Sequence, residues 1–259
     1  MAIARQVMQR PALRKSNGAI SVNLPLVDTF TPAYEAWETR PATVDEMIAN
    51  GHPGDIKVGL LARIADAHAA ADYMAGVAVD NGLSNHIRSV LSESSAYKAW
   101  QSAMPSKTPT EISRYQKDYQ KCDLSAASEE IDKYGCPLNA GQCLFHGGLW
   151  LGGNSLITSR PLSTSLCPQV ALRNAEFRAK AYDAGRLDLF VLRVINPTTK
   201  AFVFKRKGTK LGHESEVLLA SGACLTLKSE SLIRSDYRSG KYNHPDKEIP
   251  IYVLDVDVS

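Results

Sequence analysis

The sequence of 259 residues contains no apolar run that approaches the roughly 18 residues required by a membrane-spanning helix. Basic and acidic residues nearly balance, 30 against 27, and the net charge is only +3. Dedicated nucleic-acid-binding domains usually carry a strong basic excess, which this chain lacks. GxGxxG and P-loop signatures are also missing, so any nucleotide must be bound in another way. We therefore expect neither a membrane nor a nucleic acid as partner.

Cysteine is scarce, and its spacing matches neither a zinc site nor a disulfide framework. The five cysteines are odd in number and include no CxxC pair: they are Cys122, Cys136, Cys143, Cys167 and Cys224. None of them lies in a recognisable nucleophile motif. We interpret them as reduced thiols in a protein that works in a cytosol, and we expect no metal.

The first 35 residues differ from the rest of the chain. Basic residues stand at positions 5, 10, 14 and 15, and no acidic residue precedes Asp28. The apolar stretch at 20–27 is interrupted by Asn23 and Pro25, so it lacks the continuous hydrophobic segment of a secretory signal peptide. Two interpretations remain open, namely a disordered terminus and an export leader for a specialised secretion machine.

Residues 36–140 predict a helical lobe. Thr43 followed by Glu46 forms a capping-box pattern, and Gly51 supplies a stop. Residues 56–79 are rich in alanine and leucine with apolar residues at helical spacing, which predicts a helix.

Three further patterns in this lobe predict helices. Ser84 is expected to cap a helix that runs towards Trp100. The Thr-Pro-Thr-Glu sequence at 108–111 resembles a second capping box with proline at the first helical position. Residues 125–134 predict one more short helix, which Gly135 ends.

Residues 141–259 predict a β-rich core. Short runs rich in Val, Ile, Leu and Phe are bounded by Gly, Pro or Asn, as strands usually are. The expected strands are 143–145, 187–194, 201–204, 214–219, 224–227 and 249–256. One helix, 168–184, interrupts them and ends at Gly185. Helices followed by strands indicate an α+β fold, since a doubly wound sheet would alternate regularly.

Three polar segments of this core fall on or beside the expected strands. They are Phe-His-Gly at 145–147, Ser-Thr-Ser at 163–165 and Glu-Ser-Glu at 214–216. Side chains alternate along a strand, so the two serines share one face, and Glu214 and Glu216 share another. Neighbouring carboxylates repel each other unless they face solvent or have a function. Either pair alone fits the wet face of a half-exposed sheet, but the ordered combination of all three segments suggests a function.

Taken together, the three segments resemble the bacterial ADP-ribosyltransferase toxins and effectors, in particular the group with Ser-Thr-Ser and Glu-x-Glu motifs. In that family a strand ends in aromatic-Arg-Gly, a later strand carries Ser-Thr-Ser, and a third opens with Glu-x-Glu. The order here is the same, the separations are comparable, and the resemblance covers about residues 110–259. It implies a split β-sandwich with an N-terminal helical lobe, and NAD as substrate.

The resemblance assigns catalysis to three residues. Glu216 would bond the ribose 2′-hydroxyl and stabilise the positive charge that develops as the nicotinamide–ribose bond breaks. Ser163 would orient Glu216 and help to hold NAD. Glu214 would position or deprotonate the attacking group of the acceptor.

NAD binding is assigned to the same segments. His146 would hydrogen-bond a ribose hydroxyl, and the Gly147 backbone, without a side chain, would approach the nicotinamide amide. Ser163 would be assisted by Thr164 and Ser165, which shape the strand.

One departure concerns the phosphates of NAD. Most of the group has arginine at the position of His146, and neutral imidazole replaces a guanidinium poorly on phosphate. Arg160, near the second motif, and Arg63, on the expected Ala-rich helix, are the candidates to replace it.

The acceptor is expected to be a host protein, and the protein itself to be exported by a specialised secretion system into a host cytosol. The basic segment 205–212 lies where the family recognises its target. Arginine and threonine are both open as the modified residue, including threonine of host ubiquitin. Two alternatives also stay open: an NAD glycohydrolase with water as acceptor, and an inactive module that only binds a partner.

Overall fold

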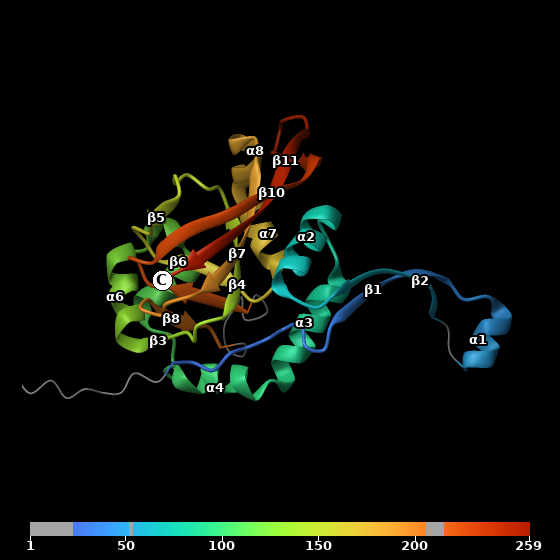
Figure 1. Cartoon of the computed structure of the whole chain (residues 1–259), viewed down its shortest axis with the longest axis horizontal. Coiled ribbons are helices and arrows are strands. Elements are labelled where there is room, and N and C mark those ends of the chain that lie inside the picture. Colours follow the sequence, from blue (N-terminus) through green and yellow to red (C-terminus); the bar gives the residue numbers. More distant parts are fainter. Residues whose placement is uncertain (1–22, 52–53, 206–214) are drawn as a thin grey trace, which may run out of the picture.

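The structure is a computed structural model that describes residues 23–51, 54–205 and 215–259 (Figure 1). Helices dominate the first half and strands the second, so the α+β class is confirmed. Among the described residues, no helix has both the length and the apolar character to cross a membrane.

Helices of the first half mostly follow the expected caps. Their bounds are α1 Val44–Asn50, α2 Ala67–Val77, α3 Asn81–Glu93, α4 Ser95–Ala103, α5 Thr110–Lys117 and α6 Leu124–Tyr134, with a 3-10 turn η1 at Tyr119–Lys121. The box of Thr43 and Glu46 is confirmed, because each side chain bonds the other's backbone N–H. Gly51 ends α1 with a left-handed φ of 73°, which glycine adopts without strain. Gly135 ends α6 as expected.

The prediction of a helix from residue 56 was wrong for its first part. Strand β2 (Asp55–Ile64) pairs antiparallel with β1 (Tyr34–Pro41), and the helix begins only at Ala67. Figure 1 shows the β1–β2 pair extending from the body with α1 at its far end. The side chain of Leu61 is 65% exposed, so the apolar spacing here does not mark a buried helical face. Pairing with a distant strand decided this segment, and helical spacing could not reveal it.

The second helix of the lobe begins earlier than predicted and is divided. Asp80 caps α3 by accepting hydrogen bonds from the N–H groups of Gly82 and Leu83, and it lies four residues before Ser84, the expected cap. Ser94 then starts α4, so two helices replace the single one expected from Ser84 to Trp100.

The expected capping box at 108–111 was also wrong. Helix α5 starts at Thr110 and has no side-chain cap of its own. Its first N–H groups, those of Glu111 and Ile112, instead bond the carboxylate of Glu130 on α6, at 2.8 and 3.0 Å. Glu130, which lies 19 positions after Glu111, therefore accepts the hydrogen bonds that an N-cap side chain would normally accept.

The β-rich half forms one sheet that is nearly divided in two. Its strands are β3 Cys136–Pro137, β4 Cys143–Gly148, β5 Ser155–Ile157, β6 Leu162–Ser165, β7 Leu187–Val194, β8 Lys200–Val203, β9 Glu216–Leu219, β10 Cys224–Ser239 and β11 Lys247–Val258. They follow the order β3-β8-β9-β6-β4-β7-β11-β10-β5. Strands β4 and β6 share only the pair Phe145 and Ser165, whereas β4 pairs with β7 along its full length. The sheet is therefore weakly joined between β4 and β6, and this junction corresponds to the split of the expected split β-sandwich.

Two elements of the core differ in extent from the prediction. The helix expected at 168–184 breaks into α7 (Pro168–Glu176), a 3-10 turn η2 (Phe177–Ala179) and α8 (Lys180–Ala184), because Arg178 and Ala179 adopt positive φ values of 58° and 60°. Strand β10 continues twelve residues beyond the expected 224–227, through a polar exposed stretch that shows no strand-like apolar run.

The N-terminal boundary lies earlier than the sequence suggested. Leu24, Val27 and Phe30 are buried in the core, and Leu24 bridges Leu138. These residues fall within the segment 1–35 that we expected to be a leader, so at least part of it belongs to the folded body. Residues 1–22 lie outside the described part of the chain.

Candidate functional site

The central contact joins Ser163 on β6 to Glu216 on β9. These strands are antiparallel, with Ser165 opposite Glu216, so Ser163 lies diagonally across from Glu216 on the same face. The Ser163 hydroxyl donates a hydrogen bond of 2.6 Å to Oε1 of Glu216. Glu216 as a whole residue is only 7% exposed. A carboxylate held in this way keeps one orientation.

A second donor reaches Glu216 from α5. Nε2 of Gln116 lies 3.2 Å from Oε2 of Glu216, so both carboxylate oxygens accept hydrogen bonds. The neighbouring Tyr115 is buried, and its phenol donates to the carbonyl of Pro161. Burial raises the pKa of Tyr115, and the nearby Glu216 charge raises it further. Sequence reasoning missed both residues, because nothing local in α5 connects it to a strand a hundred positions later.

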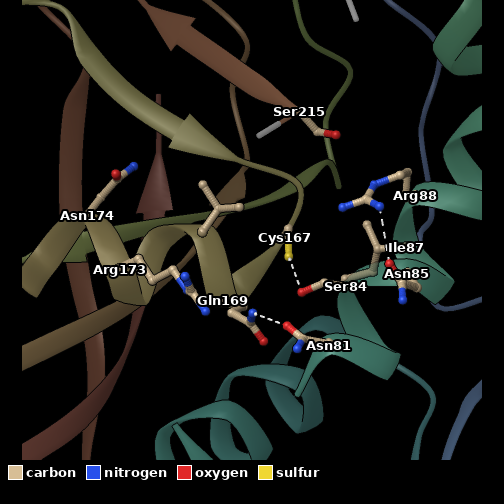
Figure 2. A pocket seen from close by; sticks show the side chains of 11 residues that line it. Asn81, Ser84, Asn85, Ile87, Arg88, Cys167, Gln169, Arg173, Asn174 and Ser215 are labelled. Carbon is tan, nitrogen blue, oxygen red and sulfur yellow. Dashed lines mark hydrogen bonds between the residues drawn. The ribbon is translucent and has the colours of Figure 1, made fainter. Parts of the chain in front are cut away.

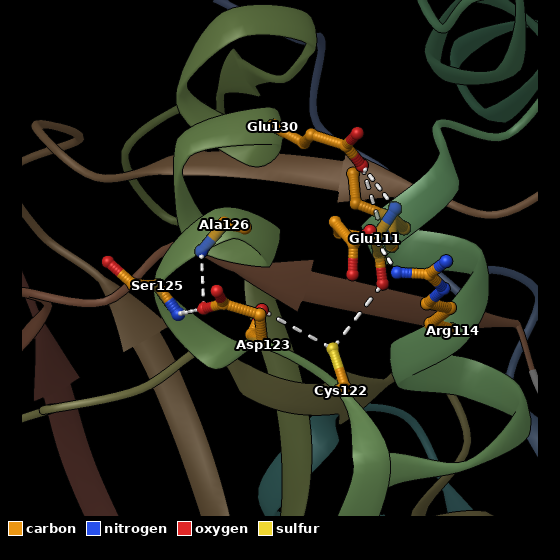
Figure 3. Close-up of polar contacts among 8 residues, drawn as sticks. Glu111, Arg114, Cys122, Asp123, Ser125, Ala126 and Glu130 are labelled. Atoms are coloured by element: carbon orange, nitrogen blue, oxygen red, sulfur yellow. Dashed lines mark hydrogen bonds and ion pairs between the residues drawn. The ribbon is translucent and has the colours of Figure 1, made fainter.

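Helix α5 is held by polar contacts at its own start and at the start of α6 (Figure 3). Glu130 holds the first turn of α5, and Glu111 forms an ion pair of 2.7 Å with Arg114. The thiol of Cys122 contacts the carbonyls of Glu111 and Asp123, while Asp123 caps α6. Burial raises the pKa of Cys122, which makes this thiol a poor nucleophile. The cluster thereby anchors the first turn of α5, the helix that carries Gln116.

His146 joins the same group through the backbone of Ser163. Its Nδ1 lies 2.7 Å from the Ser163 carbonyl oxygen. Burial, together with the charges of Lys180 and Arg160, lowers the pKa of His146 to about 4. The ring is therefore neutral at physiological pH, and Nδ1 must carry the proton because a carbonyl only accepts. Nε2 is left with a lone pair that can accept a hydrogen bond from a hydroxyl.

Two glycines allow this strand to pack. A Cβ added to Gly147 would lie 1.8 Å from the carbonyl oxygen of Ala171 on α7, and one added to Gly148 would lie 2.9 Å from Nε2 of His146. The sequence analysis assigned Gly147 to contact with nicotinamide. The structure adds a packing reason for glycine at this position, since β4 and α7 meet there without room for a side chain.

The other two residues of the Ser-Thr-Ser segment are buried and bonded within the protein. Thr164 donates a 2.6 Å hydrogen bond to the carbonyl of Val217, which ties β6 to β9. The Ser165 hydroxyl accepts from the N–H of Cys167, at the entry to α7. The Ser163 hydroxyl, by contrast, donates to the carboxylate of Glu216.

Two cationic groups lie near enough to His146 for their charges to lower its pKa. Arg160 is exposed, lies 5.4 Å from the ring centre of Tyr119 and donates a hydrogen bond to its hydroxyl. Lys180 follows the break after α7, and burial followed by the charge of Arg160 lowers its pKa. The sequence named Arg160 as a candidate for the NAD phosphates but missed Lys180, the first residue of α8 after the break in the helix. Arg63 is placed elsewhere, exposed on β2 opposite Glu35.

Parts of the predicted site lie outside the described residues. Glu214 and most of the basic segment 205–212 belong to this group. Strand β9 begins at Glu216, two residues later than predicted, and Ser215 before it has a left-handed φ of 48°.

A pocket of about 510 Å³ lies between α3 and the start of α7 (Figure 2). Eleven described residues line it, among them Arg88, Arg173 and Ser215. His146, Ser163 and Glu216 are not among them. The pocket adjoins these residues through Ser215, which precedes Glu216, and through Cys167, which bonds Ser165. Among the described residues no cluster of three or more His, Cys, Asp or Glu side chains is arranged to hold a metal ion.

Comparison with known proteins gave structural neighbours only. No family model matches the chain, and no curated protein matches it. The chain is similar to Plx2a, an ADP-ribosyltransferase toxin from Paenibacillus larvae, with 14% identity over 63% of this chain and 90% of that one, at a TM-score of 0.41. The chain is also similar to the ADP-ribosyltransferase Vis from Vibrio splendidus, in complex with agmatine. The identity is 16% over 62% of this chain and 68% of that one, at a TM-score of 0.31.

A third neighbour is the ADP-ribosylating toxin BECa of C. perfringens, solved with NADH. It is 12% identical over 88% of this chain and 56% of that one, with a TM-score of 0.39. The structural neighbours are therefore bacterial ADP-ribosyltransferase toxins. Similarity at this level does not determine an activity, which has to be inferred from the side chains of the site.

Proposed function

We propose that this protein cleaves NAD and transfers the ADP-ribose to a side chain of another protein. The observation that carries the proposal is the buried carboxylate of Glu216, oriented by Ser163 at 2.6 Å and by Gln116 at 3.2 Å. His146 is joined to the same group through the Ser163 carbonyl. Hydrogen bonds thus link four residues that are far apart in the sequence, Gln116, His146, Ser163 and Glu216, which supports the proposal.

The chemistry requires a fixed negative charge. As the bond between ribose C1′ and the nicotinamide nitrogen breaks, its electron pair leaves with nicotinamide, and positive charge develops on the ribose. A preorganised carboxylate stabilises that charge without having to reorient, and such electrostatic terms are usually the largest in catalysis. The acceptor atom then bonds C1′ and loses its proton. Glu216 supplies the charge in this scheme, and Ser163 and Gln116 are positioning residues.

Binding of NAD is divided among the neighbours of Glu216. The Nε2 atom of neutral His146 has a lone pair, so it can accept a hydrogen bond that a ribose hydroxyl of NAD donates. Arg160 and Lys180, whose charges both act on His146, are suited to the pyrophosphate that His146 itself cannot bind. Gly147 offers backbone only, and Thr164 and Ser165 hold the strand in shape.

The acceptor side of the proposal rests on the sequence. Glu214 would position or deprotonate the attacking group, and the segment 205–212 would contact the target. The modified residue is arginine or threonine of a host protein, with threonine of ubiquitin included. Export by a specialised secretion system into a host cytosol belongs to the same proposal.

Labelled NAD tests the proposal directly. The protein is incubated with labelled NAD and a eukaryotic lysate, and both free ADP-ribose and labelled protein are measured. Transfer to protein that disappears in Glu216→Gln supports the proposal. The matched control is Glu129→Gln, which removes one exposed carboxylate on α6 and should leave transfer unchanged.

The same assay separates the alternatives. Free ADP-ribose without labelled protein would indicate a glycohydrolase, and absence of both would indicate a binding module. Glu214→Gln should reduce transfer more than hydrolysis. Equal loss of both would contradict its assignment to the acceptor.

A further inference from the structure

A buried carboxylate, that of Asp188, lies on the same face of the sheet as His146. Asp188 and Phe190 are two positions apart on β7, so their side chains point the same way. Phe190 is the cross-strand partner of His146 on β4, and Asp188 is the partner of Gly148, which has no side chain to fill the space. Asp188 is 0% exposed. Burial of a charge is costly unless the charge is paired and hydrogen-bonded, so the partners of Asp188 indicate its role.

The two oxygens of this carboxylate have different partners. Oδ1 accepts a hydrogen bond from Nε of Arg186, and Oδ2 accepts one of 2.7 Å from the backbone N–H of Trp150. Arg186 is itself fixed, because its guanidinium lies 3.9 Å from the ring centre of Tyr252 and forms an ion pair of 3.0 Å with Glu230. Asp188 therefore presents a fixed acceptor to the backbone of Trp150.

The ring of Trp150 begins a row of three aromatic rings that ends at His146. Trp150 is the second residue after β4, and its indole N–H donates a 2.9 Å hydrogen bond to the carbonyl of Gly153. The ring centre of Phe190 lies 5.9 Å from that of Trp150 and 5.2 Å from that of His146, with an edge-on angle of 66° in both pairs. Edge-on packing at such distances is favourable. Asp188 thus holds one end of the row, and the imidazole is the other end.

We infer that Asp188 is a positioning residue for the binding of NAD. By holding Trp150, it keeps Phe190 packed against the ring of His146. The bond from Nδ1 to the Ser163 carbonyl fixes one atom of the imidazole, and the edge-on contact with Phe190 fixes the plane of the ring. The inference rests on the proposed function, in which Nε2 of this ring accepts a hydrogen bond from a ribose hydroxyl.

Steady-state kinetics of Asp188→Asn test the inference. Asparagine keeps the shape of the side chain but has no charge and only one acceptor oxygen. The KM for NAD should rise about threefold to tenfold with kcat nearly unchanged, as expected when one hydrogen bond to bound NAD is weakened. Asp257→Asn is the matched control, because Asp257 is also a buried carboxylate of this sheet paired with an arginine, Arg193. Arg193 is three positions from Phe190, so this pair lies on the other face, and the control should leave KM unchanged.

A double variant separates positioning from a general loss of stability. If Asp188 acts through His146, its substitution should have no further effect once His146 is replaced. Asp188→Asn/His146→Gln should therefore have the KM of His146→Gln alone. Increases in KM that multiply in the double variant would overturn the inference. So would a fall in kcat of Asp188→Asn without a change in KM.

NMR spectra of the imidazole nitrogens provide a measurement that needs no NAD. In the wild type, His146 should carry its proton on Nδ1 and titrate with a pKa of about 4. Asp188→Asn should raise this pKa towards 6.5, because a loosened ring becomes hydrated. Trp150→Leu removes the ring but keeps the N–H that bonds Asp188, so it should have the same effect and replaces Asp188→Asn if that variant does not fold.

The two kinds of measurement keep this inference distinct from the proposed function. Unchanged imidazole signals in folded Asp188→Asn or Trp150→Leu would overturn the positioning role. A wild-type protein that does not cleave NAD would refute the proposed function, while the NMR spectra would still decide whether Asp188 positions His146.

Discussion

The hydroxyl of Ser163 and the carboxylate of Glu216 meet at 2.6 Å across two strands, although the residues are 53 positions apart. The adjacent Thr164 has a similar hydroxyl, but it donates to the backbone of Val217 instead. Neighbouring hydroxyls on one strand therefore have different roles, because alternate side chains face opposite sides of the sheet. Substitutions of Ser163 and Thr164 can therefore be compared, the first as a test of carboxylate orientation and the second as a test of stability.

Ser163→Ala should lower NAD cleavage by about 10- to 100-fold with little loss of stability, because a misplaced catalytic group costs that much. Thr164→Val should instead lower the free energy of unfolding by about 0.5–1.5 kcal/mol and leave the rate per folded molecule nearly unchanged, since it removes the hydrogen bond from the Thr164 hydroxyl to the Val217 carbonyl. Steady-state kinetics and urea unfolding of both variants measure the two effects. The opposite assignment of effects would mean that the Ser163 hydroxyl does not orient Glu216.

Protonation of His146 should couple stability to pH. The unfolded chain takes up this proton near pH 6.5, whereas the folded chain takes it up only near pH 4. Between these values the unfolded state binds more protons, so stability is complete above about pH 6.5 and falls as the pH drops towards 4, by up to about 3 kcal/mol.

Urea unfolding at about pH 7.5 and about pH 5 measures this loss for wild type and His146→Gln. The glutamine amide can still donate to the Ser163 carbonyl but does not titrate, so the variant should lose less stability on acidification. An unchanged pH slope in the variant would show that His146 is not the group responsible.

Gly147→Ala should be strongly destabilising, by several kcal/mol, because the added methyl group would meet the Ala171 carbonyl at 1.8 Å and force β4 away from α7. Gly153→Ala is the matched control, since an added Cβ there has nothing within 4 Å. Thermal or urea unfolding of the two variants gives the comparison. Similar stability of both would contradict the close packing of β4 against α7.

Replacing Arg160 or Lys180 by alanine should raise the KM for NAD about tenfold each, since each removes one charge-assisted contact to a pyrophosphate. The effect should shrink at high salt, because Arg160 is exposed and its charge is screened. Arg63→Ala, on the exposed β2 strand, serves as control and should leave KM unchanged. If Arg63→Ala alone raised KM, the phosphate contacts would have to be reassigned.

Local features of the fold could be predicted because their causes lie within a few residues. The cap formed by Thr43 and Glu46, the left-handed stop at Gly51 and the buried strand Leu187–Val194 all follow from neighbouring side chains or from a continuous apolar run. The helix predicted from residue 56 failed for the opposite reason. Its backbone is bonded to β1, whose pairing partner cannot be read from apolar spacing.

For the site, the sequence by itself determined the motif residues His146, Ser163 and Glu216, their order along the chain and the chemistry that such groups can perform. Only the tertiary structure decided that Gln116 reaches Glu216, that Lys180 joins Arg160 near His146, and that burial keeps the imidazole neutral. Motif chemistry belongs to residue types and short spacings. Contacts between elements, and the desolvation that shifts a pKa, exist only once distant segments have packed together.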